Sequence, residues 1–407
     1  MIRAANEARR PDPFAMKLAT RLDRIEPFYV MECAKAATQL ARSPACADSP
    51  MIFLNIGEPD FTAPPLVQRA AEQAVRDGRT QYTDAVGLPE LRERISAWYA
   101  TRFGLNVGAD RIVVTAGASA ALQLACLALV ERGDDVLMPD PSYPCNRHFV
   151  AAAEGTARLL PASAEDRFQP TREAIEQAWD EHSRGVLLAS PSNPTGTSIE
   201  PDEMRRIVEF VRARKGFTIV DEIYLGLSYE TRFGGSALAH DGDVISINSF
   251  SKYFSMTGWR LGWMVVPQPL VSPIERLAQN LYICPSTLAQ RAALACFEAD
   301  SIAEYERRRD EFLARRDFIV PALRRLGLPV PVTPDGAFYA WADCSAHAQS
   351  SWDFTFDVMR RAHVALTPGR DFGPHSAERF VRLSFASSME HLEEAVDRLD
   401  RVLHSGA

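Results

Sequence analysis

The sequence predicts an α/β fold with a large domain around a doubly wound, mostly parallel seven-stranded sheet and a smaller α+β domain built from both chain ends. Three observations lead to this prediction. The chain has 407 residues, which is more than one core usually holds. Short apolar runs alternate with helical patterns through its middle, as in βαβ units. The last third instead combines long, charged helical patterns with a few short apolar runs.

Seven short apolar runs are the candidate strands of the large sheet. In chain order they are Arg111–Val114, Asp135–Met138, Arg158–Leu160, Gly185–Ala189, Phe217–Val220, Val244–Asn248 and Leu261–Val266. Several end in polar or glycine-containing turns, and ligands of open α/β sheets bind at such strand ends. Helices are expected between the strands, for example over Ala120–Glu131 and over Pro201–Arg214, the second introduced by Ser198.

The smaller domain is predicted from patterns near both ends of the chain. Helical patterns cover Tyr29–Arg42, Ile302–Leu326, Ser351–Ala362 and Met389–His404. Short apolar runs cover Ile52–Ile56, Ala337–Trp341 and Phe380–Phe385. We therefore expect an N-terminal arm over residues 1–24, the first part of the small domain over 25–58, the large domain over 59–297 and the rest of the small domain over 298–407.

The composition argues against several classes of partner. The net charge is −8 and no run is rich in Lys or Arg, so a nucleic-acid surface is not expected. The seven cysteines and eight histidines form no Cys-x-x-Cys or His-x-x-x-His pattern, so neither a disulfide framework nor a metal site is indicated. The N-terminus has no apolar signal-peptide core, and no segment is apolar for the ~18 residues of a membrane span. We expect a cytoplasmic protein that acts on small molecules.

The segment NSFSKYFSMTGWRLGW (248–263) follows the sixth candidate strand and carries a lysine and an arginine. Partial burial of Lys252 among serine, glycine and aromatic residues would lower its pKa and make its amine a nucleophile toward a carbonyl. Taken alone, a lysine is more often a solvated surface residue. The interpretation therefore depends on what the other strand ends carry.

Three other strand ends carry groups that complement Lys252. The fourth strand leads into SPSNPTG (190–196), where the amide of Asn193 can donate to a ligand oxygen. The fifth leads into an acid and a phenol, Asp221 and Tyr224. The first leads into the helix start TAGASAALQLA (115–125), whose N–H groups and dipole suit a phosphate. Pyridoxal phosphate needs an amine, a carboxylate, phenolate donors and an anion cradle, and all four are present.

The order of these motifs carries a family resemblance. SNPTG, then Asp-x-x-Tyr, then Ser-x-Ser-Lys followed by Gly-Trp-Arg-x-Gly-Trp, resembles the class I/II pyridoxal-phosphate-dependent aminotransferases of aspartate aminotransferase fold type I. Further landmarks follow the family's order from about residue 25 to 400. They are LNIGEPDF (54–61), QYTDAVGLPELRERIS (81–96), PDPSYP (139–144), PDGAFYAW (334–341), PGRDFG (368–373) and VRLSFA (381–386).

The resemblance assigns roles around the cofactor ring. Lys252 would form an imine with the cofactor aldehyde and, once freed by the amino acid, would move a proton between Cα and the cofactor in a ping-pong reaction. Asp221 would face the pyridine nitrogen and keep it protonated. Asn193 and Tyr224 would donate to the phenolate oxygen, and Tyr143 would stack on the ring.

The resemblance also assigns the phosphate site. Arg260 would pair with the phosphate, Ser249 would donate its hydroxyl, and the helix start at Gly117, Ala118 and Ser119 would donate backbone N–H groups. Ala118 has only its backbone to offer, whereas relatives often carry a hydroxyl there. Tyr82 resembles a tyrosine that reaches the phosphate of the neighbouring subunit, which implies a homodimer with composite active sites.

The substrate is expected to be an L-amino acid in one half-reaction and a 2-oxo acid in the other. Arg382 would clamp the α-carboxylate with two parallel hydrogen bonds, assisted by Asn193 and the backbone of Gly57. No motif places a second cation for a side-chain carboxylate. The segment containing Phe28, Tyr29 and Ile56 would line the side-chain pocket and favour an apolar or aromatic donor.

Two alternative reactions are open at this point. Ser249-Phe250-Ser251-Lys252 fits the Ser-x-x-Lys signature of penicillin-interacting serine enzymes, but the accompanying Ser-Asp-Asn and Lys-Thr-Gly elements are absent. The stronger alternative is a pyridoxal-phosphate lyase, acting by β-elimination or decarboxylation, because the same fold and cofactor support it.

Overall fold

The seven-stranded sheet of the computed structural model, which describes residues 16–27 and 29–404, contains all seven predicted strands. They are β2 (Ile112–Thr115), β3 (Asp135–Asp140), β4 (Thr156–Pro161), β5 (Ser183–Ala189), β6 (Phe217–Asp221), β7 (Ile245–Ser249) and β8 (Gly262–Val265). Their order is β2-β8-β7-β6-β5-β3-β4. Only β8 runs antiparallel to its neighbours in this sheet, so the prediction of a mostly parallel sheet is confirmed.

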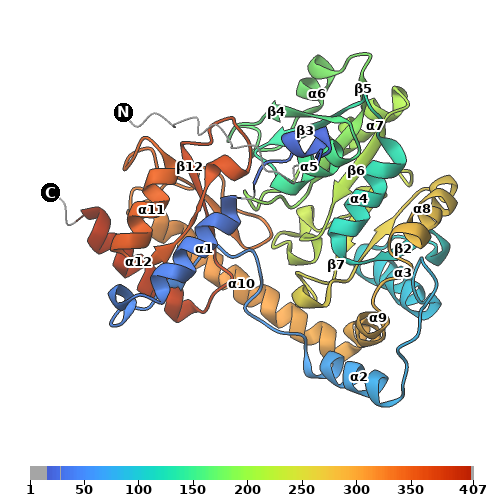
Figure 1. Cartoon of the computed structure of the whole chain (residues 1–407), viewed down its shortest axis with the longest axis horizontal. Coiled ribbons are helices and arrows are strands. Elements are labelled where there is room, and N and C mark those ends of the chain that lie inside the picture. Colours follow the sequence, from blue (N-terminus) through green and yellow to red (C-terminus); the bar gives the residue numbers. More distant parts are fainter. Residues whose placement is uncertain (1–15, 28, 405–407) are drawn as a thin grey trace.

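Helices cover both faces of this sheet (Figure 1). Alternate strand residues point to opposite faces, and in β5 Leu187 packs in one apolar cluster while Val186 and Leu188 pack in another. The Leu187 cluster includes α4 (Gly117–Leu129) and α8 (Gln268–Leu281). The other includes α3 (Pro89–Phe103) and α7 (Pro201–Ala213). Burial on both faces explains why the strands are apolar at consecutive positions.

Shorter or peripheral helices complete the part of the chain around the large sheet. They are α2 (Pro65–Arg76), α5 (Pro144–Ala152), α6 (Arg172–Ala178) and α9 (Thr287–Ala293). Four helices around the large sheet, α2, α3, α5 and α7, have proline at the first helical residue, where no backbone N–H is needed.

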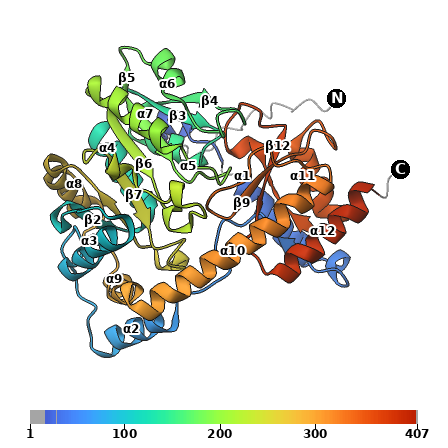
Figure 2. The ribbon, with the colours of Figure 1, turned by 180° about the vertical axis from the view of Figure 1, so that it is seen from behind.

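The two ends of the chain meet in a second α/β region. Strand β1 (Ile52–Phe53) pairs in parallel with β10 (Val364–Ala365). A separate antiparallel sheet has the order β11-β12-β9, formed by Thr367–Pro368, Phe380–Ser384 and Tyr339–Asp343. Its surrounding helices are α1 (Tyr29–Ala41), α10 (Ala299–Arg325), α11 (Ser351–Arg361) and α12 (Met389–His404). Figure 2 shows α10 running from α2 and α9 toward this region, so one helix connects both parts.

Some boundaries differ from the sequence-based expectation. Strand β1 covers two residues of the expected run 52–56, because the pairing segment β10 is equally short. Beyond it, the Leu54 N–H donates to Ala365 and its carbonyl accepts from Ser384. Helix α7 is preceded directly by Glu200 rather than introduced by Ser198, whose hydroxyl instead donates to Asp335. Residues 1–15 of the expected arm lie outside the described residues, and the four domain boundaries stay predictions.

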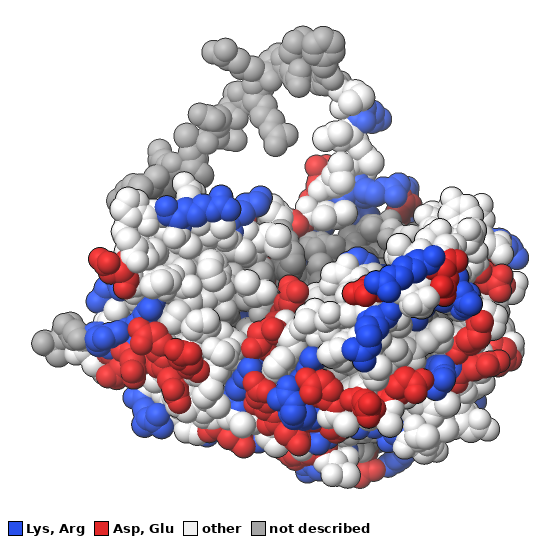
Figure 3. All heavy atoms as spheres, turned by 90° about the horizontal axis from the view of Figure 1, so that it is seen from below, with Lys and Arg blue, Asp and Glu red and all other residues white. Residues whose placement is uncertain are grey.

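Acidic and basic side chains are mixed over the face seen in Figure 3, which shows no continuous basic surface among the described residues. No helix within residues 16–27 and 29–404 is long and apolar enough to cross a membrane. The same residues contain no cluster of three His, Cys, Asp or Glu side chains that could hold a metal ion.

Candidate active site

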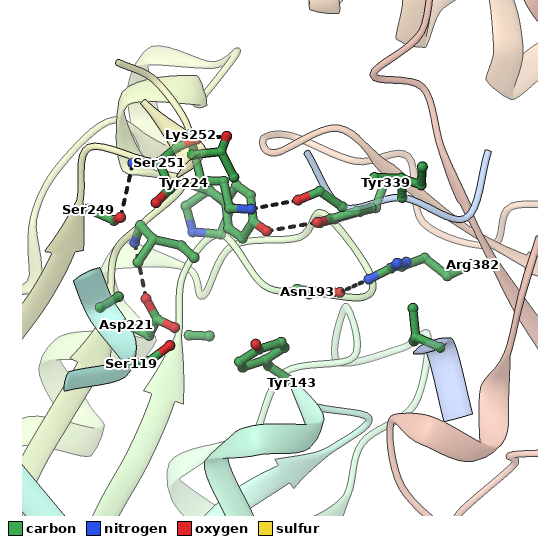
Figure 4. A pocket seen from close by; sticks show the side chains of 18 of the residues that line it. Ser119, Tyr143, Asn193, Asp221, Tyr224, Ser249, Ser251, Lys252, Tyr339 and Arg382 are labelled. Carbon is green, nitrogen blue, oxygen red and sulfur yellow. Dashed lines mark hydrogen bonds between the residues drawn. The ribbon is translucent and has the colours of Figure 1, made fainter. Parts of the chain in front are cut away.

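A cavity of about 300 Å³ lies where the carboxyl ends of β5, β6 and β7 face the β11-β12-β9 sheet. This is the edge at which open α/β sheets bind ligands. Figure 4 shows Ser119, Asp221 and Ser249 toward one end of the cavity and Arg382 at the other. Polar groups from one helix and three strands therefore converge on one cavity.

Lys252 follows β7 and projects into this cavity. The chain has four lysines, and the other three, Lys17, Lys35 and Lys215, are exposed, whereas Lys252 is half-buried. Its Nζ donates to the carbonyl of Gly57 at 2.6 Å. Burial, together with the positive charges of Arg382 and Arg260, lowers the pKa of Lys252 to about 8. Much more of this amine is unprotonated near neutral pH than of an ordinary lysine, which makes it a competent nucleophile.

Asp221 is the last residue of β6 and is 4% exposed. Its Oδ1 accepts one hydrogen bond, from the Ile223 N–H at 3.2 Å. Burial, with a smaller contribution from the neighbouring carboxylate of Glu222, raises the pKa of Asp221 to about 7. Such a carboxyl group is ready to pair with a cation or an N–H donor that enters the cavity. A protonated pyridine nitrogen has this character.

Two side chains on the cavity wall, Tyr224 and Asn193, are hydrogen-bonded to residues of the β11-β12-β9 sheet. The hydroxyls of Tyr224 and Tyr339 lie 2.8 Å apart. The side-chain oxygen of Asn193 accepts from Arg382 at 2.8 Å, which leaves its amide N–H groups as the available donors. The phenol of Tyr224 and the amide of Asn193 thus provide donors of the kind a phenolate oxygen requires.

The opposite end of the cavity offers an anion cradle. Arg260 forms no ion pair with a carboxylate of the described residues, and its guanidinium donates to the Ser251 hydroxyl at 3.4 Å and the Thr257 carbonyl at 3.0 Å. Gly117 begins α4 with φ +79°, and a Cβ there would lie 2.6 Å from the Arg260 guanidinium. Ala118 and Ser119 line the cavity at the same helix start. A cation, a helix N-terminus and nearby hydroxyls suit a phosphate.

Arg382 is 3% exposed on β12 and also lacks an ion-pair partner among the described carboxylates. One guanidinium nitrogen donates to Asn193, and another donates to the Asn55 carbonyl at 2.8 Å. Its Nε has no hydrogen-bond partner in the described part of the chain. The guanidinium lies over the ring of Tyr339, 4.4 Å from its centre. A buried, rigidly held and unneutralised arginine is suited to a carboxylate ligand.

The chain is similar to known proteins over most of its length. Residues 49–399 match the family described as aminotransferase class I and II. The valine–pyruvate aminotransferase of Mycobacterium tuberculosis is 37% identical over 382 residues, which cover 94% of this chain and 97% of that protein. The chain belongs to the class I and II aminotransferases.

Other aminotransferases are similarly related to this one. The (5-formylfuran-3-yl)methyl phosphate transaminase of Methanocaldococcus jannaschii is 34% identical and covers 95% of this aminotransferase and 100% of its own length. The crystal structure of an aminotransferase from M. tuberculosis superposes with a TM-score of 0.92 at 37% identity, covering 96% and 100% of the two chains. The fold is therefore fold type I, and the activity is amino-group transfer rather than the lyase alternative.

Most predicted site residues of this aminotransferase line the one cavity. They are Gly57, Ala118, Ser119, Tyr143, Asn193, Asp221, Tyr224, Ser249, Lys252, Arg260 and Arg382. Gly117 lies directly behind it against Arg260. Tyr82 does not line it and is 84% exposed. Ser249 donates to the Leu261 carbonyl at 3.3 Å and accepts from the Ser251 N–H at 3.0 Å.

The side-chain pocket differs in part from the expectation. Ile56 lines the cavity, whereas Tyr29 packs edge-on against Trp352, and Phe28 lies outside the described residues. Sequence reasoning did not single out eleven further lining residues: Val30, Met31, Ala34, Asn55, Leu122, Ala189, Pro191, Ile223, Ser251, Thr257 and Tyr339. Ser251 and Tyr339 lie within quoted motifs and could have been found there. Asn55 acts through its backbone carbonyl, for which the residue type gives no signal.

Proposed function

We propose that this aminotransferase holds pyridoxal phosphate at Lys252 and moves an amino group between an L-amino acid and a 2-oxo acid in a ping-pong reaction. The observation that carries the proposal is that Lys252, Asp221 and Arg382 share one cavity without neutralising one another through an ion pair. Each is costly to bury unpaired, and each complements one group of the cofactor or the substrate.

Within this proposal, the residues divide between the parts of the cofactor. Asp221 would pair with the ring nitrogen and Tyr143 would pack against the ring. Asn193 and Tyr224 would donate to the phenolate oxygen. Arg260, Ser249 and the first N–H groups of α4, at Gly117, Ala118 and Ser119, would hold the phosphate. When bound, the cofactor supplies an electron-withdrawing ring that stabilises negative charge at the substrate Cα.

The remaining groups act on the substrate. Arg382 binds the α-carboxylate through its free donor edge, and the Gly57 backbone lies beside the same position. Asn193 holds the Arg382 guanidinium at 2.8 Å and so fixes its orientation. The amine of Lys252, whose pKa is about 8, would accept the proton from the substrate Cα and pass it to the cofactor carbon that carried the aldehyde.

The assembly is proposed to be a homodimer. The exposure of Tyr82, 84% in the single chain, supports a contact with the phosphate of a partner subunit. Sedimentation of the holoenzyme tests the assembly. Mixing inactive Tyr82→Phe and Lys252→Ala proteins tests the composite site, because a mixed dimer would contain one site with both residues. Recovered activity in the mixed dimer is expected. The cytoplasmic location stays a prediction.

A single-turnover experiment tests the reaction. The holoenzyme is mixed with an amino acid in the absence of any 2-oxo acid, and the products are quantified. One equivalent of 2-oxo acid and one of pyridoxamine phosphate per site are expected. Release of ammonia or carbon dioxide without pyridoxamine phosphate would overturn the proposal.

A further inference from the structure

Helix α1 forms an apolar wall of the active-site cavity. Val30, Met31 and Ala34 line the cavity from this helix, and Ile56 lines it from the segment after β1. The spacing of the three helical residues places them on one face. Helix α1 contacts β11, whose Thr367 pairs with Arg382, and Figure 4 shows the pale blue α1 segment beside Arg382. The wall therefore adjoins the proposed carboxylate clamp, where a donor's side chain must go.

Each cation that lines the cavity already has a role in the proposed function, so none is left to bind a side-chain carboxylate. Among the described lining residues, only Lys252, Arg260 and Arg382 are cationic. Under the proposed function, the first two serve the cofactor and the third binds the α-carboxylate. A second carboxylate placed against α1 would lose its hydration without gaining a charged partner. An apolar side chain would instead remove apolar surface from water.

Asp371 anchors this wall from the other end of the chain. It is 1% exposed, and its Oδ1 accepts from the Tyr29 N–H, at the first residue of α1, at 2.8 Å. A carboxylate at this position satisfies an N–H that has no partner within the helix and opposes the positive end of the helix dipole. Because 342 positions separate the two residues, this cap determines where α1 sits and not only how it starts.

Two further residues, Arg147 and Trp352, help to hold the same helix end. Arg147 donates to the Asp371 carbonyl at 3.0 Å and pairs with Glu26 at 3.2 Å, so it connects the segment before α1 to the capping residue. Tyr29 packs edge-on against Trp352 of α11, with ring centres 5.9 Å apart. The first turn of α1 is thus held by residues of α5 and α11 and by Asp371.

We propose that α1 is the wall that selects the donor, that the enzyme accepts amino acids with apolar side chains, and that Asp371 is the positioning residue that holds the wall. This inference rests on the proposed function. It names the substrate class, and it adds a residue that does not touch the substrate.

The first test compares donors and alters the wall. In the amino-acid half-reaction we expect kcat/KM for valine, leucine and methionine to exceed that for aspartate and glutamate by on the order of 100-fold. Met31→Lys should shift this ratio at least about tenfold toward glutamate. Thr38→Lys, a matched change on an exposed position of α1 outside the cavity, should leave it unchanged.

The outcomes of this test are distinct. Equal use of aspartate and leucine by wild type, or an unchanged ratio in Met31→Lys, overturns the selection by α1 while leaving the proposed function intact. No turnover with any amino acid in either set overturns the proposed function and the substrate class with it.

The second test addresses Asp371. Asp371→Ala should raise the KM for apolar donors about tenfold with little change in the maximal half-reaction rate, and should accelerate hydrogen exchange of the first amides of α1. Asp371→Asn keeps an acceptor oxygen and should restore most of both properties. Asp353→Ala, which removes an exposed first-turn acid of α11, is the control.

Exchange in α1 that matches wild type in Asp371→Ala would overturn the anchoring role, whatever the kinetics. An equal loss of rate with every donor and an unchanged KM would also contradict it. If Asp371→Ala does not fold, Asp371→Ser removes the carboxylate while keeping a polar group in the buried position, and the same exchange measurement decides.

Discussion

Replacing Asp221 with asparagine should stabilise the cofactor-free protein and weaken cofactor binding at the same time. The buried carboxyl group has a pKa of about 7 in the folded chain against an ordinary 3.8. Ionising it in the cavity therefore costs free energy that the unfolded chain does not incur. Asparagine keeps the shape of the side chain and removes that cost.

The magnitude follows from the two pKa values. Since a tenfold change in proton affinity is about 1.4 kcal/mol, a rise from 3.8 to about 7 corresponds to about 4 kcal/mol. With an unfolding entropy of about 2.1 cal/mol/K per residue over 407 residues, this is about 5 °C in the melting temperature. Because folding raises the pKa of Asp221, the protonated carboxyl group makes its full contribution to stability below pH 3.8. This contribution is lost as the pH rises through 7.

The assay is thermal unfolding of cofactor-free wild type and Asp221→Asn between pH 4 and pH 9, with the exposed Asp166→Asn as the control. The gap between the two proteins should be small at pH 4, widen up to about pH 7 and stay constant above it. Saturating pyridoxal phosphate should then stabilise wild type more than Asp221→Asn. Equal melting temperatures at pH 8, or a gap that grows on acidification, would refute the reasoning.

Three further predictions concern the other ends of the cavity. In the cofactor-free protein, the rate at which pyridoxal phosphate attaches to Lys252 should rise with pH around a midpoint of about 8, because the amine loses its proton there. A midpoint above 10 would show that burial does not lower the pKa of Lys252. Arg382→Lys should raise the KM for amino acids roughly ten- to hundredfold, since a hydrogen bond to a charged group contributes about 1.5–3 kcal/mol; an unchanged KM would remove Arg382 from the substrate site. Gly117→Ala should weaken cofactor binding at least about tenfold by displacing Arg260. Gly78 also has a positive φ but has open space around it, so Gly78→Ala should leave cofactor binding unchanged. Equal cofactor dissociation constants in titrations of the two variants would exclude the contact between residue 117 and Arg260.

The sequence predicted the large sheet well because most of its strands, with the edge strand β4 as the exception, are buried on both faces. Consecutive apolar residues such as Val186 to Leu188 are visible as a run, and the intervening helical segments separate one run from the next. Strand β1 was less well predicted, because its length depends on β10, more than 300 positions away. Ser198 is a good helix-capping residue in general, but here it donates to the buried Asp335.

The candidate catalytic residues could be predicted where the proposed chemistry needs a particular side chain at a strand end. Asp221 and Lys252 are of this kind, and each lies at or just after the end of its strand. The contacts that hold the site together were not predictable. The Asp371 cap on α1 and the Asn55 carbonyl on Arg382 join segments more than 300 residues apart. Such contacts depend on the folded arrangement and leave no local pattern.

Reduction of the holoenzyme with borohydride tests the central claim most directly. Borohydride fixes pyridoxal phosphate to the amine that holds it, and peptide mass spectrometry then identifies that amine. The chain offers four lysines, three of them exposed, so the result is unambiguous. One cofactor mass per chain on Lys252, lost in Lys252→Ala, is the predicted result. A cofactor mass on Lys17, Lys35 or Lys215 instead, or none at all after incubation with pyridoxal phosphate, would contradict the account.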